Sequence, residues 1–218
     1  MVVQVIPSVN AQALNELKEK IMILKEVVNH FHVDVAEKKF TGSYETWLNP
    51  SYLDFLDENL IIDLHLMLFL KPQEILKWDK VNVRNFILHL EASSNPDGLL
   101  KVTKKLKKKI FIAWSPDIDF DFIKKYLDYV NGVLVLGVKP GASGQNFIEQ
   151  TYDKLSILNN LKKTKKNNLT LMVDGGINLI NFKKICNYSP DFIVMGSAIY
   201  NSQNPVKTFL EIKNSLKF

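Results

Sequence analysis

The hydrophobic pattern of this chain switches eight times between a short apolar run and a longer stretch with helical spacing. Short apolar runs are typical of parallel strands that are covered on both faces, and apolar residues three or four apart are typical of amphipathic helices. The predicted strands cover 2–7, 31–35, 60–67, 85–90, 110–114, 132–138, 169–173 and 192–196. The predicted helices cover 13–28, 51–58, 72–78, 97–107, 120–130, 147–165, 178–188 and 205–216.

This order of elements predicts an α/β fold, a single (β/α)8 TIM barrel that occupies residues 1–218 as one domain. A doubly wound open sheet is the alternative. It is less favoured, because eight regular units offer no obvious edge strand.

The composition is that of a soluble globular protein, with 46% hydrophobic and 23% charged residues. No apolar run reaches the roughly 18 residues of a membrane helix, and the first residues lack the cationic start of a signal peptide. The single cysteine, Cys186, rules out a disulfide framework within the chain and is interpreted as a small buried hydrophobe. We therefore expect a cytoplasmic protein with no membrane partner.

The net charge of +5 comes almost entirely from lysine, with clusters at 104–109 and 162–166. Arg84 is the only arginine, although arginine is favoured for the recognition of bases and phosphates. Both clusters lie where a predicted helix ends, and cations are favourable there because of the helix dipole. The clusters are interpreted as solvated surface, and no nucleic-acid partner is expected.

Four residues of metal-ligand type lie where predicted strands end: His32 and Asp34 in FHVDV, His65 in IIDLHLM and Asp174 in LTLMVDGG. His32 and Asp34 lie on the same face of their strand, because successive side chains alternate. A strand histidine taken alone is more often a hydrogen-bonded core residue. Four such residues at one rim of a barrel instead predict a divalent metal site that also offers carboxylates for proton transfer.

Several nearby residues are given lesser roles. Asp63 shares the inward face of His65 one pleat deeper, and we interpret it as a supporting hydrogen-bonding residue. His89 and Glu91 repeat the H-x-E spacing on the fourth predicted strand and are predicted to support the site. His30, at the entrance of its strand, is assigned no role.

Glycine-rich segments follow the last three predicted strands: GVKPGASGQNF, DGGIN and MGSAIY. Glycine lets backbone N–H groups approach an anion closely, and barrels often bind phosphate with the loops after strands seven and eight. Gly175, Gly176, Gly196 and Ser197 are therefore predicted to hold a phosphate group, and the loop after the sixth strand passes through Gly141 and Gly144.

The chain resembles the ribulose-phosphate 3-epimerase family over nearly its whole length. The resemblance is carried by IPSV, HVDV, DLHLM, HLEA, VKPGASGQNF, VDGGI and MGSAIY, in that order. It implies a barrel that interconverts ribulose 5-phosphate and xylulose 5-phosphate through a metal-stabilised enediolate, with Asp34 and Asp174 as the acid–base pair. It implies metal ligation by His32, Asp34, His65 and Asp174, and substrate contacts from Ser8, His65, Gly144, Gly175, Gly176, Gly196 and Ser197.

The sequence departs from the family pattern in two loops. After Asp34 the usual methionine is Ala36, an Asp-Gly turn is replaced by Glu37 and Lys38, and a Val-Pro-Asn stretch is missing. In the loop after the sixth strand, Ala142 and Ser143 replace an aromatic residue and a glycine. On the sixth strand Leu136 replaces a methionine of the family pattern, whereas the methionine at Met67 is retained. We expect these changes to alter the lid of the pocket.

Three functional hypotheses follow. The leading one is a metal-dependent pentulose-phosphate 3-epimerase. The others are a 3-epimerase of a hexulose phosphate such as allulose 6-phosphate, and a non-catalytic sugar-phosphate-binding homologue. A His/carboxylate ligand set is compatible with zinc, iron, manganese or cobalt. The family resemblance also suggests a homo-oligomer.

Overall fold

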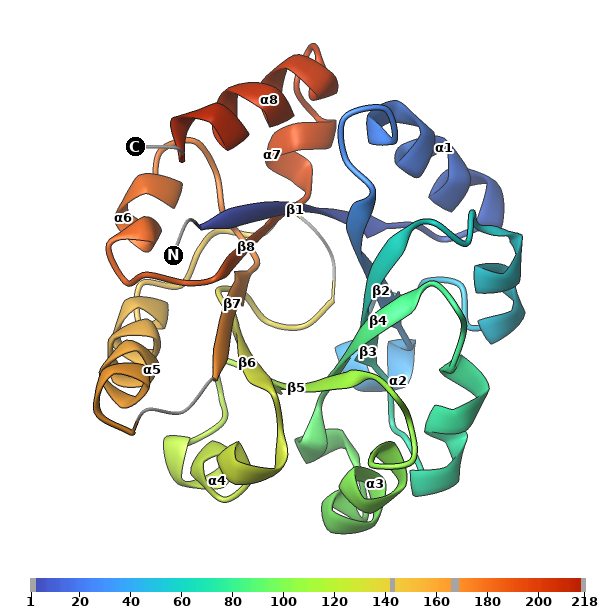
Figure 1. Cartoon of the computed structure of the whole chain (residues 1–218), viewed down its shortest axis with the longest axis vertical. Helices are drawn as coiled ribbons and strands as arrows, with labels where there is room; N and C mark the ends of the chain where they lie inside the picture. Colours follow the sequence, from blue (N-terminus) through green and yellow to red (C-terminus); the bar gives the residue numbers. More distant parts are fainter. Residues whose placement is uncertain (1–2, 142–143, 166–168, 217–218) are drawn as a thin grey trace.

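The computed structural model describes residues 3–141, 144–165 and 169–216, and its strands form a closed parallel barrel (Figure 1). Each strand pairs with the next one in sequence, and β1 also pairs with β8 through Gln4–Phe192 and the following residues. This last pairing leaves no edge strand. The predicted (β/α)8 barrel is therefore confirmed, and the open-sheet alternative is wrong.

The strands are short, as the apolar runs predict. They are β1 (Gln4–Asn10), β2 (His30–Ala36), β3 (Ile61–Met67), β4 (Val83–Leu88), β5 (Lys109–Trp114), β6 (Gly132–Leu136), β7 (Thr170–Asp174) and β8 (Phe192–Met195). The α-helices are α1 (Leu14–Leu24), α2 (Lys38–Thr41), α3 (Pro96–Thr103), α4 (Phe120–Lys124), α5 (Thr151–Lys165), α6 (Phe182–Cys186), α7 (Ser197–Tyr200) and α8 (Pro205–Ser215). The 3₁₀ helices are η1 (Pro50–Phe55), η2 (Pro72–Trp78), η3 (Leu90–Ala92) and η4 (Leu127–Tyr129).

Several connections differ from the predicted helices. The segments after β2 and β3 form the 3₁₀ helices η1 and η2, each with proline in its first turn, since such short connections favour the tighter helix. Helix α5 begins at Thr151 rather than 147, because Ile148 N–H donates to the carbonyl of Gly137 and holds the preceding segment as a loop. Strand β4 ends at Leu88, so the placement of His89 and Glu91 on that strand was wrong: both lie in the turn at η3.

The barrel interior is divided into an apolar side and a polar side. Apolar side chains from β1 and β4–β8 pack together inside the barrel: Ile6, Ile87, Phe111, Ala113, Leu134, Leu136, Met172 and Val194. The polar side chains come mainly from β1, β2 and β3: Ser8, His32, Asp34, Asp63 and His65, all buried. A second and larger core lies between the strands and the surrounding helices. Burial of polar groups without partners is costly, so this polar side requires a function or internal pairing.

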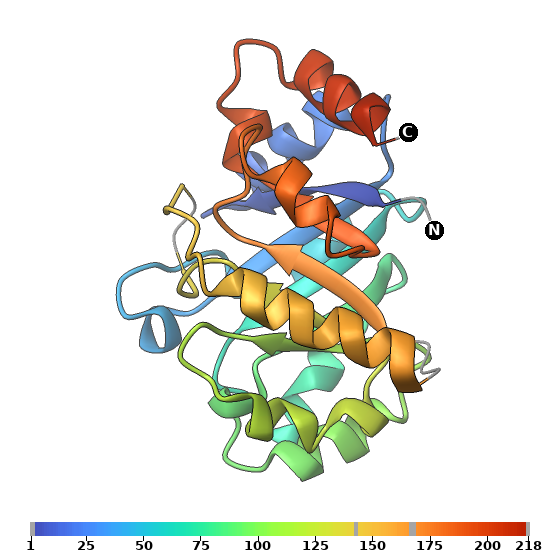
Figure 2. The same ribbon diagram turned by 90° about the vertical axis from the view of Figure 1, so that its left-hand side faces the viewer.

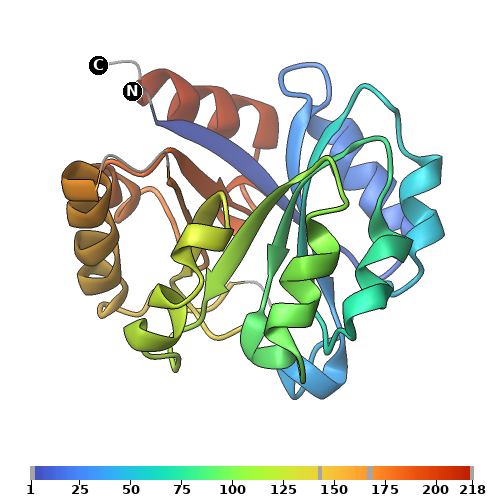
Figure 3. The same cartoon turned by 60° about the horizontal axis from the view of Figure 1, so that its bottom comes forward.

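All strands point toward one end of the barrel. In Figure 2 the arrowheads lead to the end that carries α2 and the loop after β6, whereas both chain termini lie at the other end. Figure 3 shows the same arrangement from a second direction, with α2 again at the carboxyl ends of the strands. Ligand-type residues at strand ends therefore share one rim.

The remaining sequence features lie on the outside. In the 104–109 cluster, four of the five lysines are exposed; Lys162 of the second cluster contacts Asp191 at 2.6 Å. Cys186 is half-buried against the outer core, and burial raises the pKa of its thiol. Among the described residues, no helix has both the length and the apolar character to cross a bilayer.

Candidate active site

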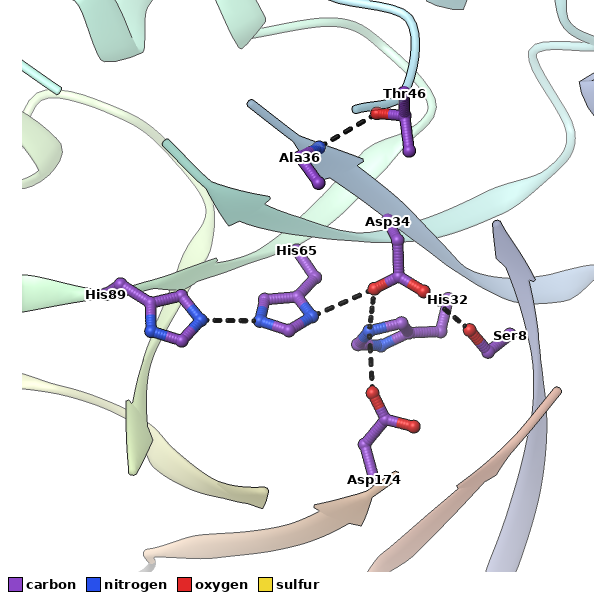
Figure 4. Close-up of polar contacts among 8 residues, drawn as sticks. All are labelled: Ser8, His32, Asp34, Ala36, Thr46, His65, His89 and Asp174. Atoms are coloured by element: carbon purple, nitrogen blue, oxygen red, sulfur yellow. Dashed lines mark hydrogen bonds and ion pairs between the residues drawn. The ribbon is translucent and has the colours of Figure 1, made fainter. Parts of the chain in front are cut away.

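His32, Asp34, His65 and Asp174 converge at the carboxyl end of the barrel (Figure 4). His32 and Asp34 come from β2, His65 from β3 and Asp174 from the last residue of β7. Asp34 and His65 are register partners on adjacent strands, which brings their side chains together. One potential ligand atom from each residue lies within 4.8 Å of all the others. The structure thus brings together the four side chains that the sequence predicted.

Asp34 lies at the centre of this group. Its Oδ1 is 2.9 Å from Nδ1 of His65 and 3.3 Å from Nε2 of His32. Its other oxygen, Oδ2, accepts a hydrogen bond of 2.8 Å from the hydroxyl of Ser8. Asp174 lies on the other side of His32, whose Nε2 is 3.8 Å from Asp174 Oδ2. The two carboxylates therefore approach the same imidazole from different strands.

The environment of His32 fits a bound cation. The residue is fully buried, and neither ring nitrogen makes a hydrogen bond within the described structure. Its only close polar contacts within the described structure are those of Nε2 with the carboxylates of Asp34 and Asp174, and a divalent ion beside Nε2 would be held by the imidazole together with both carboxylates. The mixed imidazole and carboxylate donors suit a first-row transition metal or zinc. The residues present therefore fit a divalent metal.

The four groups differ strongly in proton affinity. Burial raises the pKa of Asp34, but contact with His32 and His65 outweighs it and holds the pKa well below the ordinary range. Burial raises the pKa of Asp174 to about 7, with the charge of Asp34 adding to the effect and that of His32 opposing it. Burial lowers the pKa of His65 to about 4 despite Asp34. Burial also lowers the pKa of His32, but Asp34 and Asp174 together raise it to about 9.

A second row of polar groups continues from His65. Its Nε2 lies 2.9 Å from Nε2 of His89, whose Nδ1 lies 2.8 Å from Oε1 of Glu91. Ser115, just after β5, donates to the same Glu91 oxygen at 2.6 Å. Burial raises the pKa of Glu91, but contacts with His89 and Ser115 bring it below the ordinary value. His89 and Glu91 thus reach the site through His65, and the sequence did not indicate Ser115.

The glycine loops border a cavity that Asp34, His65 and Asp174 also line. It is lined by every residue predicted to contact substrate: Ser8, His65, Gly144, Gly175, Gly176, Gly196 and Ser197. Gly175 and Gly176 have φ of +94° and +67°, and a side chain at Gly176 would lie 2.7 Å from the backbone nitrogen of Phe147. Only glycine fits this close approach of two loops, so the backbone is exposed to the cavity there.

The altered loop after β2 folds back over the same end of the barrel. Ala36 N–H donates to Thr46 Oγ1 at 2.8 Å, and Thr46 N–H donates to the carbonyl of Ala36 at 2.9 Å, which closes residues 37–45 into a loop. The ring of Phe40 packs 4.8 Å from that of His89. Tyr44 hydrogen-bonds through its hydroxyl to Asn10 Oδ1. The loop is thus anchored although its sequence differs from the family pattern.

Asn10 was missed by the sequence analysis. It lines the cavity and is the register partner of Asp34, two residues beyond Ser8 on the same face of β1. The predicted first strand ended at residue 7, three residues short of the observed end, and this hid the period-two relation with Ser8. Leu136 and Met67 also line the cavity. Ala142 and Ser143 lie outside the described residues.

A separate polar group occupies the opposite end of the barrel. Asp63 is fully buried, its Oδ1 accepts from Asn85 Nδ2, and Nε2 of His30 lies 2.9 Å from the same oxygen. Asp63 therefore pairs away from the four-residue site, as a structural hydrogen-bonding residue, and His30, which was assigned no role from the sequence, contacts it.

The sequence profile of the ribulose-phosphate 3 epimerase family matches residues 4–200, a range that contains every candidate site residue. The chain belongs to the ribulose-phosphate 3-epimerase family. The ribulose-phosphate 3-epimerase of Buchnera aphidicola subsp. Baizongia pistaciae is 32% identical over 200 residues, which cover 89% of this chain and 87% of the relative. That of Escherichia coli K12 is 29% identical, with coverage of 85% and 83%. These epimerases are isomerases, and this family member is an enzyme of that class.

Among solved structures, 3-hexulose-6-phosphate synthase from Salmonella typhimurium aligns with a TM-score of 0.68 over 98% of both chains, at 12% identity. At this level of identity the similarity concerns the fold alone. It agrees with the closed barrel of this epimerase family member.

Proposed function

We propose that the protein is a metal-dependent ribulose-phosphate 3-epimerase that interconverts D-ribulose 5-phosphate and D-xylulose 5-phosphate. One observation carries the proposal: two carboxylates, Asp34 and Asp174, face one cavity, and their surroundings drive their proton affinities apart. Pairs of titratable groups separated in this way are the usual acid and base of an active site.

The two carboxylates would exchange protons at C3 of the ketose phosphate. Inversion requires removal of the C3 proton on one face of the sugar and delivery of a proton on the other. In the metal-free protein the low pKa of Asp34 keeps it ionised at neutral pH, the state that a base requires. In the same state the pKa of Asp174, raised to about 7, lets it hold a proton near neutral pH, the state that an acid requires. In the reverse direction the two residues exchange roles, and the hydroxyl of Ser8 keeps Asp34 oriented.

The metal ligands would be His32, Asp34, His65 and Asp174. When bound, a divalent ion supplies positive charge that stabilises negative charge developing on the substrate oxygens. Zinc, iron, manganese and cobalt all match the donor set. Ligation would also give His32 Nε2 a partner, since this nitrogen makes no hydrogen bond within the described structure.

The glycine loops would bind the phosphate of the substrate. Backbone amides in Gly144, Gly175, Gly176, Gly196 and Ser197 can donate to an anion without a cationic side chain. Ser8 and His65 would contact the sugar near the metal. The proposal further takes residues 1–218 as one domain of a cytoplasmic homo-oligomer whose partner is this small phosphorylated ketose, in keeping with the family resemblance.

The test is incubation of metal-loaded protein with ribulose 5-phosphate in D2O, followed by NMR of the sugar. We expect deuterium at C3 and formation of xylulose 5-phosphate. Absence of both with metal bound would overturn the proposal and leave a sugar-phosphate-binding homologue.

Allulose 6-phosphate is the second substrate to test, since Tyr44 of the unusual loop 37–45 hydrogen-bonds to Asn10, which lines the cavity. A higher kcat/KM for the hexulose phosphate would reassign the substrate while retaining the same chemistry.

A further inference from the structure

We propose that His89, Glu91 and Ser115 form a hydrogen-bond relay that fixes which ring nitrogen of His65 faces the metal. These residues act through His65 and are positioning residues. The inference rests on the proposed metal site, and it concerns groups that lie behind the ligands.

The contacts at the outer end of the relay determine which nitrogen of His89 carries hydrogen. The hydroxyl of Ser115 has one hydrogen and donates it to Glu91 Oε1 at 2.6 Å. That hydrogen is therefore not available to His89 Nδ1, which lies farther from Ser115 Oγ, at 3.2 Å. His89 Nδ1 is 2.8 Å from the same Glu91 oxygen. A carboxylate accepts hydrogen bonds only, so Nδ1 of His89 must carry the proton that points at Glu91.

The next link follows from the tautomer of His89. A neutral imidazole with hydrogen on Nδ1 has a lone pair on Nε2. Nε2 of His65 is 2.9 Å away, and the two rings lie nearly in parallel planes, inclined by 19° with centroids 5.1 Å apart. Figure 4 shows the two rings edge to edge with these nitrogens facing each other, and this arrangement directs an N–H of one ring at the lone pair of the other. His65 therefore donates from Nε2.

His65 is then left with a lone pair on Nδ1, directed at the site. Nδ1 is 2.9 Å from Asp34 Oδ1, which is itself an acceptor. Two acceptors at this distance repel each other unless a cation binds both. With both rings neutral, the opposite tautomer would direct the lone pair of His89 Nδ1 at the carboxylate of Glu91. A second proton on His89 would avoid this, but it would place a positive charge in the ring that faces His65, and a cation bound at His65 and Asp34 disfavours that state. The relay thus favours the state of His65 that ligates a metal.

The relay is sheltered and anchored. His65, His89 and Ser115 are each at most 6% exposed, so water does not compete for their hydrogen bonds. Phe40 packs against the ring of His89. Lys154 from α5 donates to the carbonyl of Ser115 at 2.6 Å and fixes the outer end. A rigid outer partner is the condition for orienting a ligand.

The experiment measures metal binding directly. Co²⁺ alone is titrated into metal-free protein against a chelator, for wild type and for His89→Phe, which keeps a ring but removes the acceptor. We expect the Kd for Co²⁺ to rise about 10- to 100-fold in His89→Phe. His89→Gln, whose carbonyl oxygen can accept from His65, should recover most of the affinity. His30→Gln, at the other end of the barrel, is the matched control and should leave the Kd unchanged.

A second readout reports the tautomer. In Zn²⁺-loaded wild type, ¹⁵N NMR should show hydrogen on Nε2 of His65 and on Nδ1 of His89. Hydrogen on His65 Nδ1, or an unchanged Kd in a folded His89→Phe protein, would overturn the relay while leaving a metal-binding epimerase intact. If wild type binds no Co²⁺, the proposed function and the relay both fail. If His89→Phe does not fold, the NMR assignment of wild type still tests the tautomer of His65. The Kd of His89→Gln for Co²⁺ still tests whether a hydrogen-bond acceptor at position 89 supports metal binding.

Discussion

The same two strands carry a histidine–carboxylate group at each end of the barrel, and the two groups have different properties. The upper group, at the carboxyl ends of the strands, consists of His32, Asp34, His65 and Asp174. The lower group consists of His30, Asp63 and Asn85. Both draw on β2 and β3, and in both most of the side chains are buried, with Asp174 and His30 partly exposed.

The difference lies in the number of carboxylates and in what they face. In the lower group the single carboxylate, Asp63, has His30 and Asn85 beside one oxygen, whereas its other oxygen has no hydrogen bond within the described structure. In the upper group two carboxylates and two imidazoles lie together, and both carboxylates line a cavity. Residue type alone therefore does not indicate a metal site, whereas several donor atoms that converge beside a cavity do.

The largest effect should come from the acid–base pair. Asp34→Asn and Asp174→Asn each remove a proton carrier while keeping its shape, and we expect kcat to fall about 10²- to 10⁴-fold. His30→Gln in the lower group should keep kcat within about twofold. Steady-state kinetics on ribulose 5-phosphate measure both. A variant with a near-normal rate would remove that aspartate from the pair.

Metal binding should stabilise the folded protein through the upper group and not through the lower group. Chelation should abolish activity, and readdition of Zn²⁺, Mn²⁺ or Co²⁺ should restore it. A metal at about 100 times its Kd stabilises the folded state by about 2.7 kcal/mol, which thermal unfolding detects. Asp63→Asn should keep this stabilisation and Asp34→Asn should lose it. Full activity after exhaustive chelation would argue against a metal.

The metal-free protein should lose stability as pH rises from about 6.5 to 9. The pKa of His32 is raised to about 9 in the folded protein, so its contribution is fully present below 6.5 and is lost as pH passes through 9. The raised pKa of Asp174 acts in the same direction up to about 7. One proton gives a slope of at most about 1.4 kcal/mol per pH unit. Urea unfolding at several pH values measures it, and a slope that persists in His32→Gln would contradict the assignment.

The smallest effect should come from the lower group. Asp63→Asn retains a hydrogen-bonding side chain between His30 and Asn85, so the free energy of unfolding should fall by about 1 kcal/mol. The Kd for Co²⁺ should not change. A marked loss of metal affinity would show that the two ends of the barrel are coupled.

The parts of the molecule that were predictable from the sequence depend on local periodicity. The alternation of apolar runs predicts the eight units of the barrel, because strand and helix periods are properties of neighbouring residues. The period of two places His32 and Asp34 on one face, and the ends of the runs place His65 and Asp174 at the same rim. Boundaries were less accurate: the strand that ended too early concealed Asn10, and the strand that ended too late misplaced His89 and Glu91.

The contacts between distant segments could not be read from the sequence. The pairing of His30 with Asp63, and the link from His65 through His89 to Ser115, join residues that are 24 or more positions apart along the chain. The path of residues 37–45 depends on the hydrogen bonds between Thr46 and Ala36 and between Tyr44 and Asn10. No local propensity specifies such pairs.

The sequence by itself determined the barrel, the family and the four side chains of the proposed metal site, because each depends on short motifs and on the pleat of single strands. The tertiary structure alone decided which nitrogen of His65 faces Asp34, which carboxylate holds a proton near pH 7 in the metal-free protein, and which buried aspartate contacts His30. Those properties arise from burial and from the approach of groups on different strands, and these exist only once the barrel has closed.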